Sequence, residues 1–154
     1  FRAMPNIAIA QGQSMTCVSY SNATDSQIEM VENFFNQVGE VIFVKEKMMD
    51  SCTVMAGSGI AFALRFIRAA MQAGIQIGFD ASTSLKIVSQ VMNGATALLE
   101  ANKSHPEQEI DRVTTPKGCT IAGLNRMELQ GFSPSVVAGI QHTLEAIEGI
   151  KRQH

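Results

Sequence analysis

Apolar residues change their spacing near residue 45, and this change separates two kinds of local structure. Before residue 45 the pattern predicts strand, helix and strand. Residues 13–20 mix small and β-prone side chains, and residues 41–44 are a short apolar run. Between them Thr24 and Gln27 form a capping box that predicts a helix start, and Gly39 is expected to end that helix. The apolar stripe of the helix comprises Ile28, Val31, Phe34, Phe35 and Val38.

After residue 45 only helices are predicted. Residues 48–55 can form a helix, which Gly57-Ser58-Gly59 is expected to interrupt. Residues 60–73 then form a helix in which the polar side chains are Arg65, Arg68 and Gln72. A helix with so narrow a polar stripe is typical of the centre of a bundle, so we expect other helices to surround it.

Three longer helices and one short helical segment complete the chain, over residues 84–101, 105–113, 119–129 and 134–151. Asp80 or Ser82 is expected to cap the first of them. Ser133 is expected to cap the last, with Pro134 at its first helical position.

Composition narrows the class of protein. Hydrophobic residues make up 45% of the 154 residues and charged residues 17%, which is typical of a globular, well-buried chain. The net charge of −2, without a basic block, argues against binding to nucleic acid or an anionic membrane. Arg65, Arg68 and several glycines interrupt the longest apolar stretches, so no membrane span is expected.

Cysteines and histidines predict no metal site. The cysteines are Cys17, Cys52 and Cys119, an odd number at spacings that fit no zinc or disulfide framework. Reduced thiols and a cytoplasmic location are therefore expected. Surface or capping roles are expected for the histidines, which are His105, His142 and His154.

The apolar helix over residues 60–73 also bears on assembly. A helix of this kind favours a second copy of the chain that completes its burial, and the less favoured alternative is that it forms the centre of a monomeric core. We expect a homodimer or a higher oligomer.

A turn into a helix at residues 114–123 is the first candidate site. The first amides of a helix lack internal partners and carry partial positive charge, so they can hold a small anion such as a carboxylate. Thr115 and Thr120 could add hydroxyl donors. On the residues alone, an ordinary capped helix start is the more common explanation.

Gly57-Ser58-Gly59 and Thr53 form the second candidate region. The two glycines cost helix stability but permit a ligand or another backbone to approach closely. The Thr53 hydroxyl, with Glu46 and Asp50 upstream, could bond a substrate nitrogen. Helix packing explains the glycines about equally well, and Thr53 alone is an ordinary helix residue. The chain shows no Gly-x-Gly-x-x-Gly and no Walker loop.

Taken in order, several segments resemble pyrroline-5-carboxylate reductase. They are Arg2-Ala3-Met4-Pro5-Asn6, Gly57-Ser58-Gly59, the run from Gly94 to Glu100, His105-Pro106, Val113-Thr114-Thr115-Pro116, the run from Gly118 to Leu124, and Glu128-x-x-Gly131-Phe132. The part from His105 to Gly123 is the most specific. The resemblance extends along the whole chain.

The resemblance implies a mainly α fold. Residues 1–45 would be the end of a Rossmann domain, a strand–helix–strand remnant. Residues 46–154 would be a helical dimerisation and substrate-binding domain, of the kind found at the carboxyl end of 6-phosphogluconate-dehydrogenase-like proteins. The main nucleotide site would lie outside this chain, which would then be inactive alone.

The resemblance also implies a reaction, the reduction of 1-pyrroline-5-carboxylate to L-proline by hydride transfer from NADPH or NADH. It places Thr53 at the ring nitrogen as the catalytic residue. Substrate-binding positions would be Glu46, Thr115, Gly118, Cys119 and Thr120. Positions near the cofactor would be Met4, Pro5, Asn6 and Ser58. The cofactor carries the chemistry, and the protein supplies position and electrostatics.

Two positions depart from the family pattern. Ile60 stands where proline is common, and Lys117 stands where the first of two glycines is common. Lys117 could strengthen attraction for a carboxylate, or it could disturb the loop because lysine tolerates positive φ poorly. A divergent, non-catalytic helical dimerisation or ligand-binding module is therefore the alternative. A reductase of the β-hydroxyacid dehydrogenase type is less favoured, since residues 60–73 contain no lysine.

Overall fold

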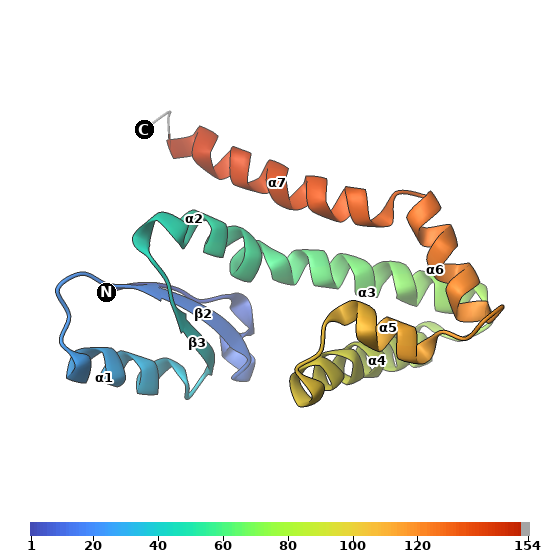
Figure 1. Ribbon diagram of the computed structural model, residues 1–154, viewed down its shortest axis with the longest axis horizontal. Helices are drawn as coiled ribbons and strands as arrows, with labels where there is room; N and C mark the ends of the chain where they lie inside the picture. The colour runs from blue at the N-terminus through green and yellow to red at the C-terminus, as the bar shows by residue number, and fades with distance from the viewer. Residues whose placement is uncertain (152–154) are drawn as a thin grey trace. The chain divides into compact units, whose positions relative to one another are not determined.

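The computed structural model describes residues 1–151; His154 and its predicted surface role lie outside the described residues. The chain divides into two units, which we describe separately. One contains residues 1–63 and the last helix from Val137 onward, and the other contains residues 64–136. Figure 1 shows the order of the elements along the chain.

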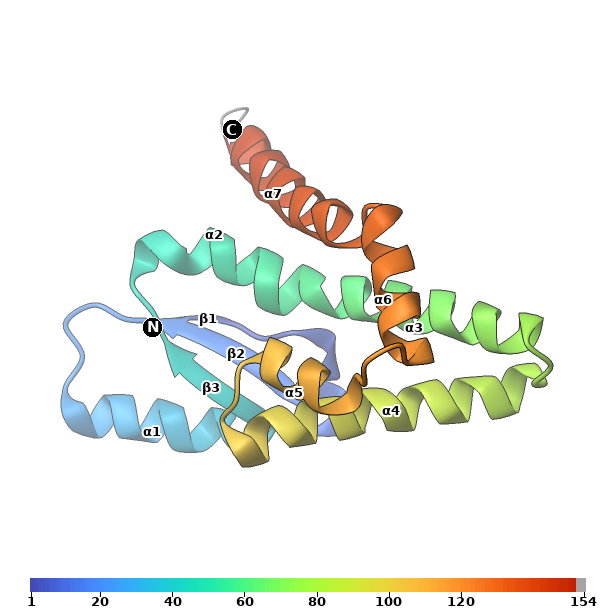
Figure 2. The ribbon, with the colours of Figure 1, turned by 45° about the vertical axis from the view of Figure 1, so that its right-hand side comes forward.

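The first unit contains a three-stranded sheet in the order β1-β2-β3 (Figure 2). The strands are β1 (Arg2–Met4), β2 (Ser14–Ser19) and β3 (Gly39–Phe43). β1 runs antiparallel to β2, with Arg2 opposite Ser19, and β3 runs parallel to β2, with Ser14 opposite Gly39. The strands predicted at residues 13–20 and 41–44 are confirmed. Strand β1 was not predicted, because three residues carry too little alternation to be recognised.

Helix α1 (Asp25–Phe35) joins the two parallel strands. The predicted capping box is present, since the Thr24 hydroxyl accepts from the Gln27 amide and the Gln27 side chain accepts from the Thr24 amide. The prediction that Gly39 ends this helix is wrong, because the helix ends at Phe35 and Gly39 begins β3. A Cβ at Gly39 would lie 2.0 Å from the Ser14 carbonyl oxygen, so glycine is needed where the two strands first approach.

The buried core of this unit lies between the sheet and the helix that follows it. Cys17 of β2 packs with Cys52 and Ala56, and Met15 and Val44 lie against them. Burial, together with a hydrogen bond to Cys52, raises the pKa of the Cys17 thiol to about 12. Cys17 and Cys52 are free thiols, as predicted, and Cys119 is free and exposed.

A single helical stretch of 31 residues runs from Glu46 to Gln76. It begins with a 3₁₀ turn (Glu46–Met48) and α2 (Met49–Cys52), continues through a π-helical turn (Thr53–Ser58), and ends as α3 (Gly59–Gln76). We call Thr53–Ser58 the π-turn. The prediction that Gly57-Ser58-Gly59 interrupts the helix is wrong: the extra residue is absorbed by the wider π geometry, and the helix continues.

Helix α3 is apolar and has no buried residue within the chain. The expectation that other helices surround it is therefore not met by a single copy. By length and composition this stretch would be long enough to cross a membrane, with a mean hydropathy of 1.4 over its most apolar window. Arg65 and Arg68 do not end the helix, so the expected absence of a membrane span stays a prediction.

In the second unit, α3 is followed by α4 (Ala81–Asn102), α5 (Pro106–Val113) and α6 (Cys119–Leu129). The predicted cap of α4 is confirmed for Asp80, whose carboxylate accepts from the amides of Ser82 and Thr83 at 3.0 Å. His105 caps α5, as predicted, by accepting from the Glu107 amide.

Helix α7 (Phe132–Lys151) begins earlier than predicted. Pro134 is its third residue and Ser133 is already helical, because Gly131, at φ 81°, turns the chain directly into it. At its other end Lys151 donates to the Asp50 carboxylate at 2.5 Å, which links this helix to α2 within the first unit.

Close packing between α3 and α4 depends on Gly74. Ser84 is buried and donates its hydroxyl to the Met71 carbonyl at 2.9 Å. A Cβ at Gly74 would lie 2.1 Å from the Ser84 Oγ and 3.1 Å from its Cβ. Rotation of the hydroxyl would relieve only the first contact and would break its bond to Met71.

Replacement of Gly74 by alanine tests this close approach. We expect Gly74→Ala to lower the free energy of unfolding by about 1–3 kcal/mol, the usual cost of overpacking. Gly94→Ala in α4 is the matched control, because a Cβ there meets nothing within 4 Å; it should stabilise by about 0.5–1 kcal/mol. Urea denaturation of both variants measures the difference. Equal effects of the two substitutions would contradict the close packing at Gly74.

Candidate active site

The π-turn positions the predicted catalytic residue. Thr53 is the first residue of the turn, and its hydroxyl donates to the Met49 carbonyl at 2.9 Å. That bond uses the only hydroxyl proton, so the oxygen retains lone pairs that can accept a further hydrogen bond. Single π-turns within α-helices are frequent at functional sites, because the widened backbone displaces side chains and carbonyl groups from their regular places.

The end of strand β1 lies against this turn. Asn6 donates its side-chain amide to the Ala56 carbonyl at 3.1 Å. A Cβ at Gly57 would lie 3.3 Å from the Met4 methyl carbon, so the turn approaches Met4 closely. The structure thus brings the segment Met4-Pro5-Asn6 to the turn that contains Thr53 and Ser58, although fifty residues separate them in sequence.

Glu46 occupies a separate polar cluster at the start of the same helical stretch. Its two carboxylate oxygens accept from the Arg2 guanidinium and from the Ser19 hydroxyl. Both hydrogen bonds hold the pKa of the Glu46 carboxyl below its usual value, and the bond from Ser19 has the larger effect. Arg2 and Ser19 are opposite one another on β1 and β2. Sequence reasoning missed both, because cross-strand pairing leaves no local signal.

The predicted anion site lies at the start of α6 in the second unit. The chain turns at Thr115, whose carbonyl accepts from the Gly118 amide at 2.9 Å, and Gly118 is the N-cap residue. No side chain caps the helix. The first amides, at Cys119 and Thr120, therefore remain available to an anion. A Cβ at Gly118 would lie 2.6 Å from the Thr115 hydroxyl oxygen and 3.0 Å from the Thr115 carbonyl oxygen, so a side chain there would require the turn to shift.

Lys117 shows how the chain accommodates its departure from the family pattern. The residue adopts φ 60°, the left-handed conformation that glycine takes most readily. The turn is formed all the same, since the Gly118 amide donates to the Thr115 carbonyl. Whether Lys117 strengthens attraction for a carboxylate or disturbs binding stays a prediction. Its ammonium group adds positive charge directly before the α6 amides.

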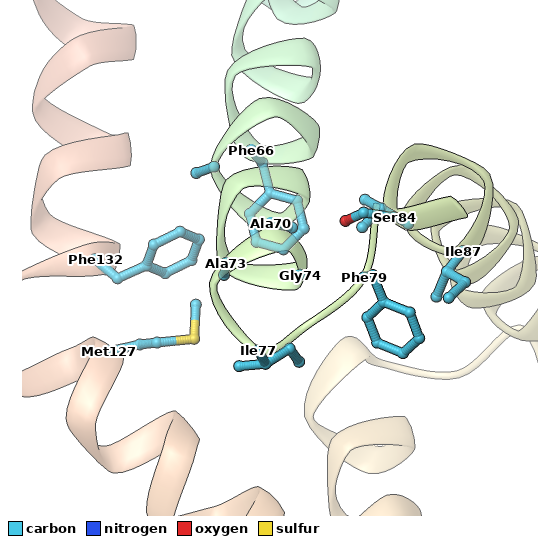
Figure 3. Close-up of a pocket in the computed structure, with 12 residues that line it drawn as sticks. Phe66, Ala70, Ala73, Gly74, Ile77, Phe79, Ser84, Ile87, Met127 and Phe132 are labelled. Carbon is cyan, nitrogen blue, oxygen red and sulfur yellow. The ribbon is translucent and has the colours of Figure 1, made fainter. Parts of the chain in front are cut away.

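Two cavities lie among apolar residues. One, of 520 Å³ in the second unit, is lined by helices α3, α4, α6 and α7 and by the loop between α3 and α4. Its lining includes Phe66, Ile77, Met127 and Phe132 (Figure 3). The Phe66 and Phe132 rings meet edge to face at 6.1 Å. The other, of 670 Å³ in the first unit, includes Cys17, Cys52 and Ala56. Neither was predicted from sequence.

The predicted site residues thus form two groups. Met4, Pro5, Asn6, Glu46, Thr53 and Ser58 belong to the first unit, and Thr115, Gly118, Cys119 and Thr120 to the second. Within the first group, Met4 and Asn6 contact the π-turn that contains Thr53 and Ser58, and Glu46 belongs to the separate cluster with Arg2 and Ser19. Whether both groups serve one substrate stays a prediction. Among residues 1–151 no cluster of three or more acidic, histidine or cysteine side chains could hold a metal ion.

Comparison with known proteins identifies the family. Residues 46–150, most of the chain, match the family described as pyrroline-5-carboxylate reductase dimerisation. The chain belongs to the pyrroline-5-carboxylate reductase family. It is 45% identical to pyrroline-5-carboxylate reductase 1 of Dictyostelium discoideum, over 90% of this chain and 27% of that protein. It is 43% identical to reductase 2 of the same organism, over 94% of this chain and 52% of that protein.

A solved structure agrees with the family assignment. A Plasmodium falciparum pyrroline carboxylate reductase with NADP bound superposes with a TM-score of 0.86 at 27% identity, over 94% of this chain and 58% of that one. The chain spans about half the length of this relative and of the second Dictyostelium protein. The predicted fold class, a helical domain after a Rossmann remnant, is confirmed. The division at residue 45 stays a prediction.

The Glu46 cluster leads to a prediction about pH. A carboxyl whose pKa is lowered in the folded state stabilises the fold above its unfolded pKa, and this stabilisation is lost as pH falls through the folded value. Glu46→Gln should therefore be less stable than the parent near pH 7, and the difference should shrink below about pH 4. Thermal denaturation across pH measures it. The control is Glu29→Gln, on the exposed side of α1. If Glu29→Gln changes stability with pH as Glu46→Gln does, the stabilising role of the Glu46 cluster is refuted.

Proposed function

We propose that this chain is the catalytic and substrate-binding part of a reductase that converts 1-pyrroline-5-carboxylate to L-proline with NADPH or NADH. Family membership supports the reaction class, and the NADP-bound relative supports the cofactor class. The proposal depends most on the π-turn. Thr53 is the first residue of this turn, and the turn contacts Met4 and Asn6.

The hydrogen bond of Thr53 defines what this residue can do. Because its proton is donated to Met49, the Thr53 oxygen can only accept from the substrate. A protonated C=N group offers an N–H donor, whereas a neutral imine nitrogen does not. Thr53 would therefore select and orient the iminium form, in which the carbon is most electrophilic, and would go on to accept from the N–H of the amine product.

The cofactor, when bound, supplies a hydride to the ring carbon of the C=N group. Met4, Pro5, Asn6 and Ser58 would lie beside its nicotinamide. Gly57 suits this arrangement, because it leaves no side chain between Met4 and the backbone of the turn. Reduction moves the electron pair of the C=N bond to the nitrogen, and the nitrogen retains its proton and lies against Thr53.

The substrate carboxylate would bind at the start of α6. The uncapped amides of Cys119 and Thr120 and the helix dipole favour a negative group there, and Lys117 adds a full charge. The Thr115 hydroxyl lies against Gly118 and could donate to the same group. Glu46, proposed as a further substrate-side residue, would act through a carboxylate that Arg2 and Ser19 already orient.

Self-association is part of the proposal. Helices α3 and α4 expose large apolar side chains, including Leu64, Ile75, Leu85, Ile87 and Val91. Apolar surface of this extent usually marks an interaction site, and the matched family is named for dimerisation. We propose a homodimer or a higher oligomer, in a reducing, cytoplasmic setting that suits the three free thiols.

The alternative is a divergent helical module that associates but no longer binds a substrate. Lys117 in a strained conformation is the observation that favours it, since the loop differs there from the family pattern. The two proposals differ in whether the α6 amides bind a ring carboxylate.

Replacement of Thr53 tests the catalytic role. We expect Thr53→Val, which keeps the shape but loses the oxygen, to lower kcat/KM for pyrroline-5-carboxylate about 10- to 100-fold, the usual effect of losing a hydrogen bond to a charged group. Thr53→Ser should retain most activity. The assay uses a chimera in which residues 1–154 replace the matching half of Dictyostelium discoideum reductase 2. An inactive parent chimera that binds cofactor, or an active Thr53→Val, would refute this function.

Alkylation of Cys119 tests the anion site. Cys119 is exposed, whereas Cys17 and Cys52 are buried, so iodoacetamide should modify Cys119 first. L-proline or tetrahydrofuroate, bound at the α6 amides, should slow this modification in the chimera, while cyclopentane, which lacks the carboxylate, should not. Cys119→Ser identifies the modified thiol by mass spectrometry. Equal rates with and without the ring carboxylates would favour the non-catalytic module.

A further inference from the structure

The Asn6 side chain makes two hydrogen bonds within the protein, one as donor and one as acceptor. Asn6 is 8% exposed and lies just beyond strand β1. Its Oδ1 accepts from the Ala8 amide at 3.0 Å, and its Nδ2 donates to the Ala56 carbonyl at 3.1 Å. Its backbone amide donates to the Ser14 hydroxyl at 3.2 Å. An amide donor and a carbonyl acceptor on opposite sides fix the orientation of the side-chain amide, because only one orientation satisfies both.

The bond to Ala56 is made at the place where the helix departs from α geometry. Ala56 is in the middle of the π-turn and is 8% exposed. A π-turn displaces backbone carbonyls from the regular ladder, and a buried carbonyl without a partner is costly. Asn6 provides that partner from a segment fifty residues earlier. The close approach of Gly57 to Met4 is a second contact between the same two segments.

Both ends of the π-turn have proposed functions. Thr53 is its first residue and Ser58 its last, so a rotation of the turn about its axis would move both side chains together. The bond to Ala56 is at the centre of the turn and restrains that rotation. The capping bond to Ala8, in contrast, serves only the 3₁₀ turn at Ile7–Gln11.

We propose that Asn6 is a positioning residue: its side-chain amide holds the Ala56 carbonyl and so orients Thr53 and Ser58, instead of contacting the cofactor. This inference rests on the proposed function. The bonds to Ala56 and Ala8 leave the amide one N–H and one Oδ1 lone pair to offer a cofactor, and at 8% exposure the residue has little access to one. The two roles differ in their kinetics, since a positioning residue affects the hydride step and a ligand affects cofactor affinity.

Two substitutions separate the bond to Ala56 from the capping bond. Asn6→Asp keeps the shape and the capping oxygen but removes the donor to Ala56. Asn6→Ser keeps a good capping residue that is too short to reach Ala56. Asn33→Asp, on the exposed side of α1, is the control for the same chemical change. All are made in the chimera with Dictyostelium discoideum reductase 2.

We expect both Asn6 variants to lower kcat about 10- to 100-fold, with the Kd for NADPH changed less than about twofold. The deuterium isotope effect with labelled NADPH should rise, because hydride transfer becomes more rate-limiting. Asn33→Asp should resemble the parent. The inference is overturned if kcat is unchanged, or if NADPH affinity falls as much as kcat, as loss of a cofactor contact or of the fold would cause. An inactive parent chimera would instead refute the proposed function.

Discussion

A single buried hydrogen bond connects the two parts of the first unit that the proposed chemistry requires. The Asn6 amide donates to the Ala56 carbonyl at 3.1 Å, and both residues are almost wholly shielded from water. At 8% exposure each, the two residues have little access to solvent, so loss of this bond would leave a largely buried donor and acceptor without a partner. The arrangement of Thr53 and Ser58 beside the end of β1 depends on this constraint.

Burial is distributed unevenly along the chain, and this has consequences for stability. The buried core residues lie in the sheet and in the stretch from Met49 to Ala56, while α3 contributes none. Contacts such as Ser84 against Gly74 hold α3 and α4 together locally. The apolar side chains that remain exposed on these helices would account for a large gain in stability on association with a second copy.

The local sequence predicted the backbone geometry of one part of the candidate site, at α6, but not that of the other, at the π-turn. At α6 the local sequence was sufficient: Gly118, the turn before it and the free amides lie where the motif predicted them. At the π-turn the local sequence misled, because glycines that were expected to break a helix instead lie within it. Arg2 and Ser19, which orient Glu46, were not predicted because they meet Glu46 only after the strands pair.

Local signals determined most of the helix boundaries, the capping box at Thr24 and the strands at residues 13–20 and 41–44. These features depend on neighbours within a few residues, so spacing and capping chemistry suffice to predict them. The tertiary structure alone decided that β1 is a strand, that Asn6 reaches Ala56, and that Gly39 and Gly74 permit close contacts. Each of these requires residues distant in sequence to meet, and their free energy arises only when the chain has folded.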